Sequence, residues 1–292
     1  MKNLTKLKIG NISYTNTWPV SHFFNKEKFK EEVEFVPQVP SQLNQQMAEG
    51  RIDLGPISSF SYAEHSDEYL ILPNLSVSAY GNVGSISLFL KDDLDIIKDK
   101  KIALSNTSAT SVNLLKIILE GFLGGKPDYT TMPPQLNIMM ETADAALLIG
   151  DEAIIAGWKN NKTKQYRMID LGAEWLRRTN QWMTFAVWAV RMEVVQKKPG
   201  LLYRIYQEFL RSKERGKKEI KVIITETIKR FGGSQSFWQG YFAGLSHDFD
   251  ERQIRGLKHY FKLAKDINLL SSVPEIKVID FKKLTDNLLY KI

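Results

Sequence analysis

The chain contains no cysteine among its 292 residues. Disulfides, thiolate metal sites and cysteine nucleophiles are therefore excluded, and this composition suits a reducing compartment. No apolar run approaches the roughly 18 residues that span a bilayer, and the first eight residues lack the apolar segment of a secretion signal. We expect a cytoplasmic protein that does not insert into a membrane.

Motifs for common cofactors and nucleophiles are missing as well. The sequence has no Gly-x-Gly-x-x-Gly, no Gly-Lys-Ser/Thr phosphate loop and no Gly-x-Ser-x-Gly elbow. The four histidines show no metal-ligand spacing, and the acidic run at 247–251 is typical of a helix start. We therefore predict no metal site.

The charge balance is basic, with a net charge of +7. This favours an anionic partner such as a small acid, and it also promotes solubility. Much of the excess lies in residues 211–218, a run typical of a solvated helix end. No nucleic-acid motif accompanies it, so we expect no nucleic-acid partner.

The first 90 residues alternate between strand and helix patterns. Strands are predicted at 6–13, 33–38 and 52–57, with a short helix at 17–24 between the first two and a helix at 41–47 between the last two. This βαβαβ order predicts a parallel sheet with right-handed crossovers.

A second set of α/β patterns begins after residue 100, and helical spacing dominates beyond Pro199. We expect an α/β fold of two lobes around a central cleft. Residues 1–91 and 186–292 form the first lobe with a C-terminal helical layer, and residues 92–185 form an inserted second lobe. Crossings near 87–91 and 186–191 would act as a hinge that closes the cleft on a ligand.

Polar residues gather at four predicted strand ends. Ligands of open parallel sheets bind at the carboxyl ends of strands, where helix N-termini also meet. We predict that the cleft is lined from these ends by Tyr14, Asn16, Thr17, Ser58, Ser59, residues 105–111, Gly150 and Asp151.

The stretch at 105–111 is the richest in hydrogen-bonding groups. One serine suffices for a helix N-cap, whereas here six of seven residues carry a hydroxyl or an amide. The free N–H groups and the dipole of a helix start attract anions. We therefore predict a loop that binds a carboxylate or phosphate through Ser105, Thr107, Ser108, Ala109, Thr110 and Ser111.

Three residues permit both a structural and a functional interpretation. Asn16 is either a turn residue or an amide that orients a ligand. Ser85 follows turn glycines, and at a lobe crossing its hydroxyl would face the cleft. For Asp151 a helix cap is favoured over a buried role against Arg191 or a ligand.

A series of short motifs runs through the first 190 residues. It begins with Ile12-Ser13-Tyr14-Thr15-Asn16-Thr17-Trp18-Pro19 and continues with Gly50-Arg51-Ile52-Asp53, Thr107 to Ser111, and Asp-Ala-Ala-Leu-Leu-Ile-Gly-Asp at 144–151. Asp170-Leu171-Gly172 and Phe185-Ala186-Val187-Trp188-Ala189 follow. In number and order these motifs resemble the chorismate dehydratases of menaquinone biosynthesis by the futalosine route.

The resemblance implies a type II periplasmic-binding-protein-like fold and a hydro-lyase. Chorismate would lose water and become 3-[(1-carboxyvinyl)oxy]benzoate, without a metal or organic cofactor. The resemblance also implies that Asn16 and Ser85 are the catalytic pair. Our hypothesis is that Asn16 holds the departing hydroxyl or a carboxylate, and that Ser85 donates to a carboxylate or relays a proton. A substrate carboxylate could itself accept the proton.

Two segments depart from the family pattern. Thr15 stands where leucine is usual, and Asn180-Gln181-Trp182-Met183-Thr184 replaces a glycine-leucine-proline-like segment at the cleft mouth or hinge. Two other functions remain open on this fold: a non-catalytic small-anion binding protein and the sister naphthoate synthase of the pathway. We expect a monomer or a homodimer.

Overall fold

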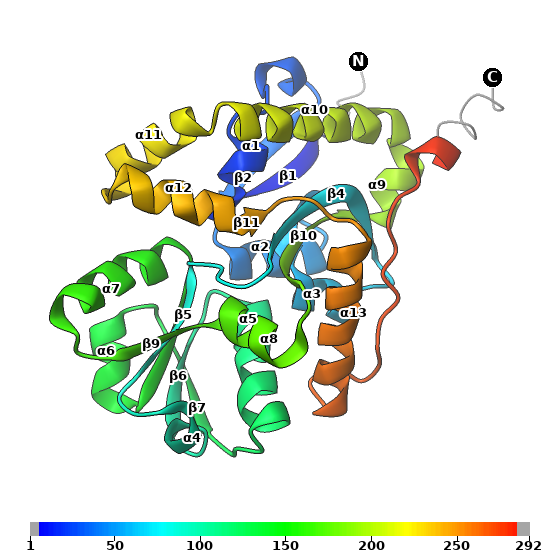
Figure 1. Cartoon of the computed structure of the whole chain (residues 1–292). Helices are drawn as coiled ribbons and strands as arrows, with labels where there is room; N and C mark the ends of the chain where they lie inside the picture. The colour runs from blue at the N-terminus through cyan, green and yellow to red at the C-terminus, as the bar shows by residue number, and fades with distance from the viewer. Residues whose placement is uncertain (1–5, 285–292) are drawn as a thin grey trace.

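The computed structural model describes residues 6–284, which form two sheets flanked by helices (Figure 1). The first sheet has the strand order β11-β4-β10-β3-β1-β2, and the second has the order β7-β6-β8-β5-β9. The strands of the first sheet are β1 (Leu7–Ile12), β2 (Val33–Gln38), β3 (Leu54–Ser58), β4 (Tyr69–Ala79), β10 (Met183–Arg191) and β11 (Leu245–Ser246). Those of the second are β5 (Ile86–Leu90), β6 (Lys101–Ser105), β7 (Asp128–Met132), β8 (Ala145–Ile149) and β9 (Arg167–Asp170).

The first sheet is mixed. Strand β1 runs parallel to β2 and β3, which confirms the predicted βαβαβ unit. Strand β10 then pairs antiparallel with both β3 and β4. The helices that connect the first four strands of this sheet are α1 (Trp18–Ser21), α2 (Pro40–Ala48) and α3 (Ser59–Glu64). Leu43 of α2 packs so closely on Gly10 that a Cβ on residue 10 would lie 2.1 Å from Leu43 Cδ1, so a larger residue there would force the Leu43 side chain to move.

The second sheet has β6 parallel to β7 and β8, while β5 runs antiparallel to β8 and β9. Strand β7 was not predicted, because this edge strand is polar and no residue in it is fully buried. The helices of this lobe are α4 (Leu94–Ile97), α5 (Ala109–Lys116) with a π-helical extension (Ile117–Phe122), α6 (Leu136–Thr142), α7 (Gly150–Thr163) and α8 (Leu171–Thr179).

The chain crosses between the sheets at residues 80–85 and 180–182, earlier than expected. The predicted boundaries placed β5 in the first lobe, but it pairs with β8 and β9 of the second sheet. Met183–Phe185, assigned to the second lobe, begin β10 of the first sheet. All five residues of β5 are buried, so no local pattern shows which sheet it joins.

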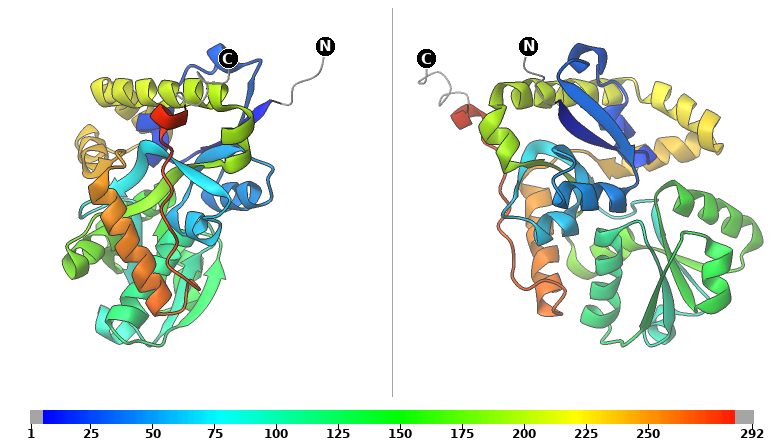
Figure 2. Two further views of the ribbon diagram at one scale, coloured as in Figure 1. Left: turned by 90° about the vertical axis from the view of Figure 1, so that its right-hand side faces the viewer. Right: turned by 180° about the vertical axis from the view of Figure 1, so that it is seen from behind.

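Helices of the C-terminal half cover the first sheet and reach the second lobe. They are α9 (Met192–Lys197), α10 (Pro199–Lys218), α11 (Ile220–Phe231), α12 (Gln235–Gly244) and α13 (Glu251–Asp266). Helix α10 packs on α1, whereas α13 contacts both β10 and α5, so it connects the two lobes (Figures 1 and 2). Of the helices between residues 6 and 284, none has the length and apolar composition that a bilayer crossing requires.

Candidate active site

A small cavity lies between the two sheets, with a volume of ≈ 50 Å³. Seven of the predicted site residues line it: Tyr14, Asn16, Thr17, Ser58, Ser108, Ser111 and Gly150. Apolar side chains complete the wall: Ile12, Pro40, Val77, Ile86, Ile149, Phe185 and Ala186. A larger groove of ≈ 580 Å³ beside Tyr80 and Trp182 is lined by none of the predicted residues. We therefore place the candidate site in the small cavity, which both lobes enclose.

Thr15 joins the lobes through Asp151. Its Oγ1 donates to Oδ1 of Asp151 at 2.6 Å, and its backbone N–H points at both carboxylate oxygens at 3.3 Å. Asp151 lies in the first turn of α7 in the second lobe and is buried. Burial raises the pKa of Asp151 to about 6, although the Thr15 hydrogen bonds lower it. The favoured prediction of a helix cap was wrong, since the N-cap of α7 is Ile149. Asp151 contacts the turn after β1 and not Arg191, and it does not line the cavity.

Tyr14 covers the start of α7 and lines the cavity. Gly150 has φ +66°, and a Cβ on it would lie 2.6 Å from Cε2 of Tyr14. The glycine thus permits both the left-handed turn into α7 and the close approach of the ring. Thr17 closes the turn after β1, because its Oγ1 donates to the carbonyls of Ile12 and Tyr14 at 3.2 and 3.1 Å.

The loop at 105–111 contributes two of its hydroxyl side chains to the cavity wall. Ser108 is the N-cap of α5, accepting the Ser111 N–H at 3.2 Å, and both serines line the cavity. Ser105 and Thr107 instead hydrogen-bond to each other at 2.6 Å. Thr110 accepts the Phe60 N–H at 3.0 Å through its Oγ1, and it does not line the cavity, nor does Ala109.

The two serines after β3 have different environments. Ser58 caps α3 by accepting the Ser61 N–H at 3.1 Å, and its hydroxyl also accepts from Asn44 Nδ2 at 3.1 Å. It lines the cavity. Ser59 donates to the carbonyl of Thr184 at 2.8 Å and lies outside the cavity wall, where it ties α3 to β10.

Asn16 and Ser85 both carry a buried side-chain oxygen without a hydrogen-bond partner among the described residues. Asn16 lines the cavity. Ser85 does not: it lies in the bend before β5, and Ile86, the first residue of that strand, lines the wall instead. The Ser85 carbonyl accepts the Gly150 N–H at 2.7 Å, so Ser85 lies next to Gly150, a residue of the cavity wall.

Two residues of the C-terminal layer reach this region and were not predicted. The Tyr241 ring packs on Gly84, and its hydroxyl lies near those of Ser85 and Thr15 without meeting hydrogen-bond geometry. His247 contacts the Asn16 carbonyl through Nε2 at 2.7 Å. Both lie more than 150 residues from their neighbours in sequence, so only an alignment of relatives could have indicated them beforehand.

The electrostatics of the cavity are those of neutral donors and acceptors. None of the described residues that line it is Lys or Arg, so the net charge of +7 acts from outside the wall. Within residues 6–284, no group of His, Asp or Glu is arranged to hold a metal ion. The site is therefore suited to bind polar or anionic groups through hydroxyls, amides and the N–H groups of a helix start.

Known sequences and structures resemble the chain over most of its length. A family profile described as menaquinone biosynthesis matches residues 7–266. The chorismate dehydratase of Thermus thermophilus is 30% identical over 264 residues, which cover 86% of this chain and 93% of that protein. The chorismate dehydratase of Campylobacter jejuni is 24% identical over 266 residues, which cover 89% of this chain and 98% of that protein.

Among solved structures, the periplasmic aliphatic sulphonate binding protein of Escherichia coli aligns with a TM-score of 0.63 at 16% identity, covering 94% of this chain and 92% of that one. This likeness confirms the predicted periplasmic-binding-protein-like fold.

Proposed function

The chain belongs to the menaquinone biosynthesis family, and from that premise we propose that it is a chorismate dehydratase acting at the cavity between the two sheets. In this reaction chorismate becomes 3-[(1-carboxyvinyl)oxy]benzoate. A ring C–H bond and the neighbouring C–OH bond break, the electron pair of the C–H bond becomes a ring double bond, and the proton leaves with hydroxide as water. Because the product ring is aromatic, the main tasks of the protein are positioning and charge stabilisation.

One observation carries the placement of the chemistry, the unpartnered amide oxygen of Asn16 at the cavity wall. Buried polar atoms almost always have a hydrogen-bond partner, yet Oδ1 of Asn16 has none among residues 6–284. This supports a role toward a ligand. We infer that Asn16 Oδ1 accepts from the departing hydroxyl of chorismate, or that Nδ2 of the same amide donates to the neighbouring carboxylate.

The substrate carboxylates need donors, and the start of α5 offers them. Ser108 and Ser111 line the cavity at the N-terminus of α5, where free N–H groups and the helix dipole favour an anion. Ser58 adds a hydroxyl from the other lobe. We infer that one carboxylate binds at Ser108 and Ser111. We also infer that a substrate carboxylate accepts the ring proton, since none of the described residues in the cavity wall is a strong base.

Substrate entry requires the lobes to separate. The cavity of ≈ 50 Å³ is smaller than the roughly 300–1,000 Å³ of common ligand pockets. We infer that the lobes hinge at the crossings 80–85 and 180–182, the second of which lies within the divergent segment 180–184. Opening would break the hydrogen bonds between Thr15 and Asp151, and it would give the hydroxyl of Ser85 room to donate to a carboxylate or relay a proton.

Incubation of the purified protein with chorismate, followed by mass spectrometry, tests the proposal. We expect a product lighter by one water. In Asn16→Ala the rate should fall about a hundredfold, as for loss of one preorganised polar group at a reacting centre, and Ser85→Ala should lower it as well. Asn137→Ala on the exposed start of α6 is the matched control and should keep the wild-type rate.

Both alternative functions give a result that differs from that of a dehydratase in the same experiment. A small-anion binding protein would bind chorismate and return it unchanged. A naphthoate synthase would also leave chorismate unchanged. Turnover that persists in Asn16→Ala would contradict the assignment of Asn16 while leaving the reaction itself intact.

A further inference from the structure

The segment His247–Asp248 lies outside regular secondary structure, yet several hydrogen bonds hold it in place. Ser76 of β4 contacts it twice, donating its N–H to the His247 carbonyl at 3.2 Å and its hydroxyl to the Asp248 carbonyl at 2.5 Å. Ser246 Oγ accepts the Asp248 N–H at 3.3 Å. These contacts fix the segment against β4 of the first lobe.

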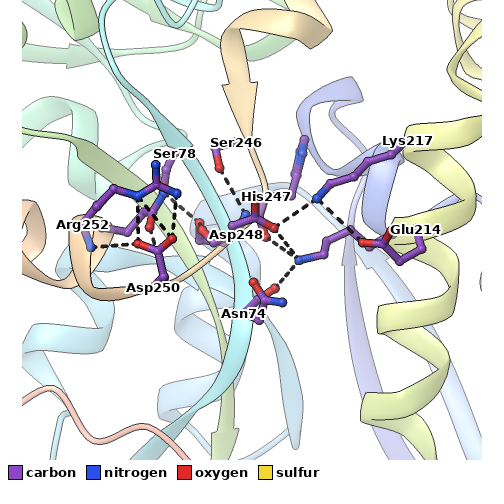
Figure 3. Close-up of polar contacts among 12 residues, drawn as sticks. Asn74, Ser78, Glu214, Lys217, Ser246, His247, Asp248, Asp250 and Arg252 are labelled. Carbon is purple, nitrogen blue, oxygen red and sulfur yellow. Dashed lines mark hydrogen bonds and ion pairs between the residues drawn. The ribbon is translucent and has the colours of Figure 1, made fainter.

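A buried lysine adds to this attachment. Lys213 of α10 is only 1% exposed, and its ammonium donates to Asp248 Oδ1 at 2.8 Å, to the Asn74 carbonyl at 2.6 Å and to the His247 carbonyl at 3.5 Å. Lys217 pairs with the same Asp248 oxygen at 3.2 Å and faces Glu214 (Figure 3). Burying an ammonium group costs free energy unless hydrogen-bond acceptors replace the lost water. The three acceptors around Lys213 compensate for that cost only if they stay in place.

His247 extends from this segment to Asn16. Its Nε2 lies 2.7 Å from the Asn16 carbonyl oxygen, and because a carbonyl only accepts, Nε2 carries the proton. Burial lowers the pKa of His247 to about 4; Lys213 and Lys217 lower it further, while the bond to Asn16 and the charge of Asp248 oppose the shift. The ring is thus neutral near pH 7, with a fixed tautomer.

The two residues 15 and 16 are held from different lobes. Thr15 is bound by Asp151 of the second lobe, a contact that opening would break. His247 follows β11, and the turn that carries Asn16 follows β1; both strands belong to the first sheet. The bond between His247 and Asn16 therefore stays within one lobe. Because the Asn16 amide oxygen has no partner of its own among residues 6–284, its position depends on the main chain that carries it.

We propose that Lys213, Asp248 and His247 form a positioning relay that fixes the main chain of Asn16 in both the open and the closed state. The relay rests on the proposed function insofar as it serves catalysis by Asn16. His247 is a positioning residue, since it touches Asn16 and not the cavity. The relay transmits the rigidity of α10 and β4 to the reacting centre, where a displacement of about 1 Å can cost on the order of a hundredfold in rate.

Two isosteric replacements of His247 separate its hydrogen bond from its packing. In His247→Gln the amide nitrogen can occupy the place of Nε2 and still donate to Asn16. In His247→Asn the amide reaches only the place of Nδ1 and cannot. We expect kcat of His247→Asn to fall at least about tenfold with KM changed less than about threefold, and both constants of His247→Gln to stay within about threefold of wild type.

A second readout does not depend on turnover. With selective ¹⁵N-asparagine labelling, the backbone resonance of Asn16 should move further from its wild-type position in His247→Asn than in His247→Gln, two variants that both lack the imidazole ring. If His247→Asn does not fold, Lys213→Met replaces it, because Asp248 then keeps its pairing with Lys217; the resonance should again move.

The outcomes distinguish the relay from the proposed function. Unchanged chorismate with the wild-type protein refutes the dehydratase, while the resonance of Asn16 still tests the relay. Equal kcat values for the two His247 variants, or an Asn16 resonance that His247→Asn leaves in place, would overturn the relay.

Discussion

Replacing Asp151 with asparagine should change the way in which stability depends on pH. Burial raises the pKa of this carboxyl from 3.8 to about 6 in the folded protein. Between these two values the unfolded chain releases the proton while the folded protein retains it. Ionisation therefore favours the unfolded state as pH rises, and the stability that the protonated group provides below pH 4 is lost as pH passes 6.

The size of the effect follows from the two pKa values. A shift of about two units corresponds to about 3 kcal/mol at 1.36 kcal/mol per unit. Asparagine does not ionise, but it weakens the bond from the Thr15 hydroxyl, which costs about 1 kcal/mol at every pH. We expect Asp151→Asn to be less stable than wild type by about 1 kcal/mol at pH 4 and more stable by about 2 kcal/mol at pH 7.

Urea unfolding of both proteins between pH 4 and pH 7.5 measures this difference. Subtracting the two free energies of unfolding removes the titration of all other groups, and Asp128→Asn on the exposed start of β7 controls for the chemical change. A difference that stays constant with pH, or that favours wild type as pH rises, would refute the argument that burial dominates the environment of Asp151.

Two further predictions concern the cavity wall. Gly150→Ala should destabilise the fold by about 2–4 kcal/mol, from the left-handed backbone and the overlap with the Tyr14 ring, and should lower turnover; a melting temperature equal to that of wild type would contradict this. Ser108→Ala should cost about 1 kcal/mol as a lost helix cap and raise KM for chorismate, whereas Ser234→Ala, which removes the equivalent cap of α12, should cost the same stability and leave KM unchanged. Equal KM values for the two variants would argue against anion binding at the start of α5.

Local sequence patterns determined most of the elements and the candidate loops. Strand β2 begins and ends where the pattern at 33–38 predicts, because residues that favour turns and helix starts bound it. The same patterns located the polar strand ends, and Asn16 and Ser58 do line the cavity. The sequence pattern is sufficient to locate a strand end because the residues next to it in sequence determine where the strand stops.

Only the tertiary structure decided which hydroxyls line the cavity and which residues pack around it. Ser59 and Thr110 look like Ser58 and Ser108 in sequence, but they bond to Thr184 and Phe60, which the fold brings beside them. The same holds for the sheet that β5 joins and for the contact of His247 with Asn16, 231 residues apart. Strand pairing and buried hydrogen bonds between distant segments depend on how the elements pack, and local composition does not encode that packing.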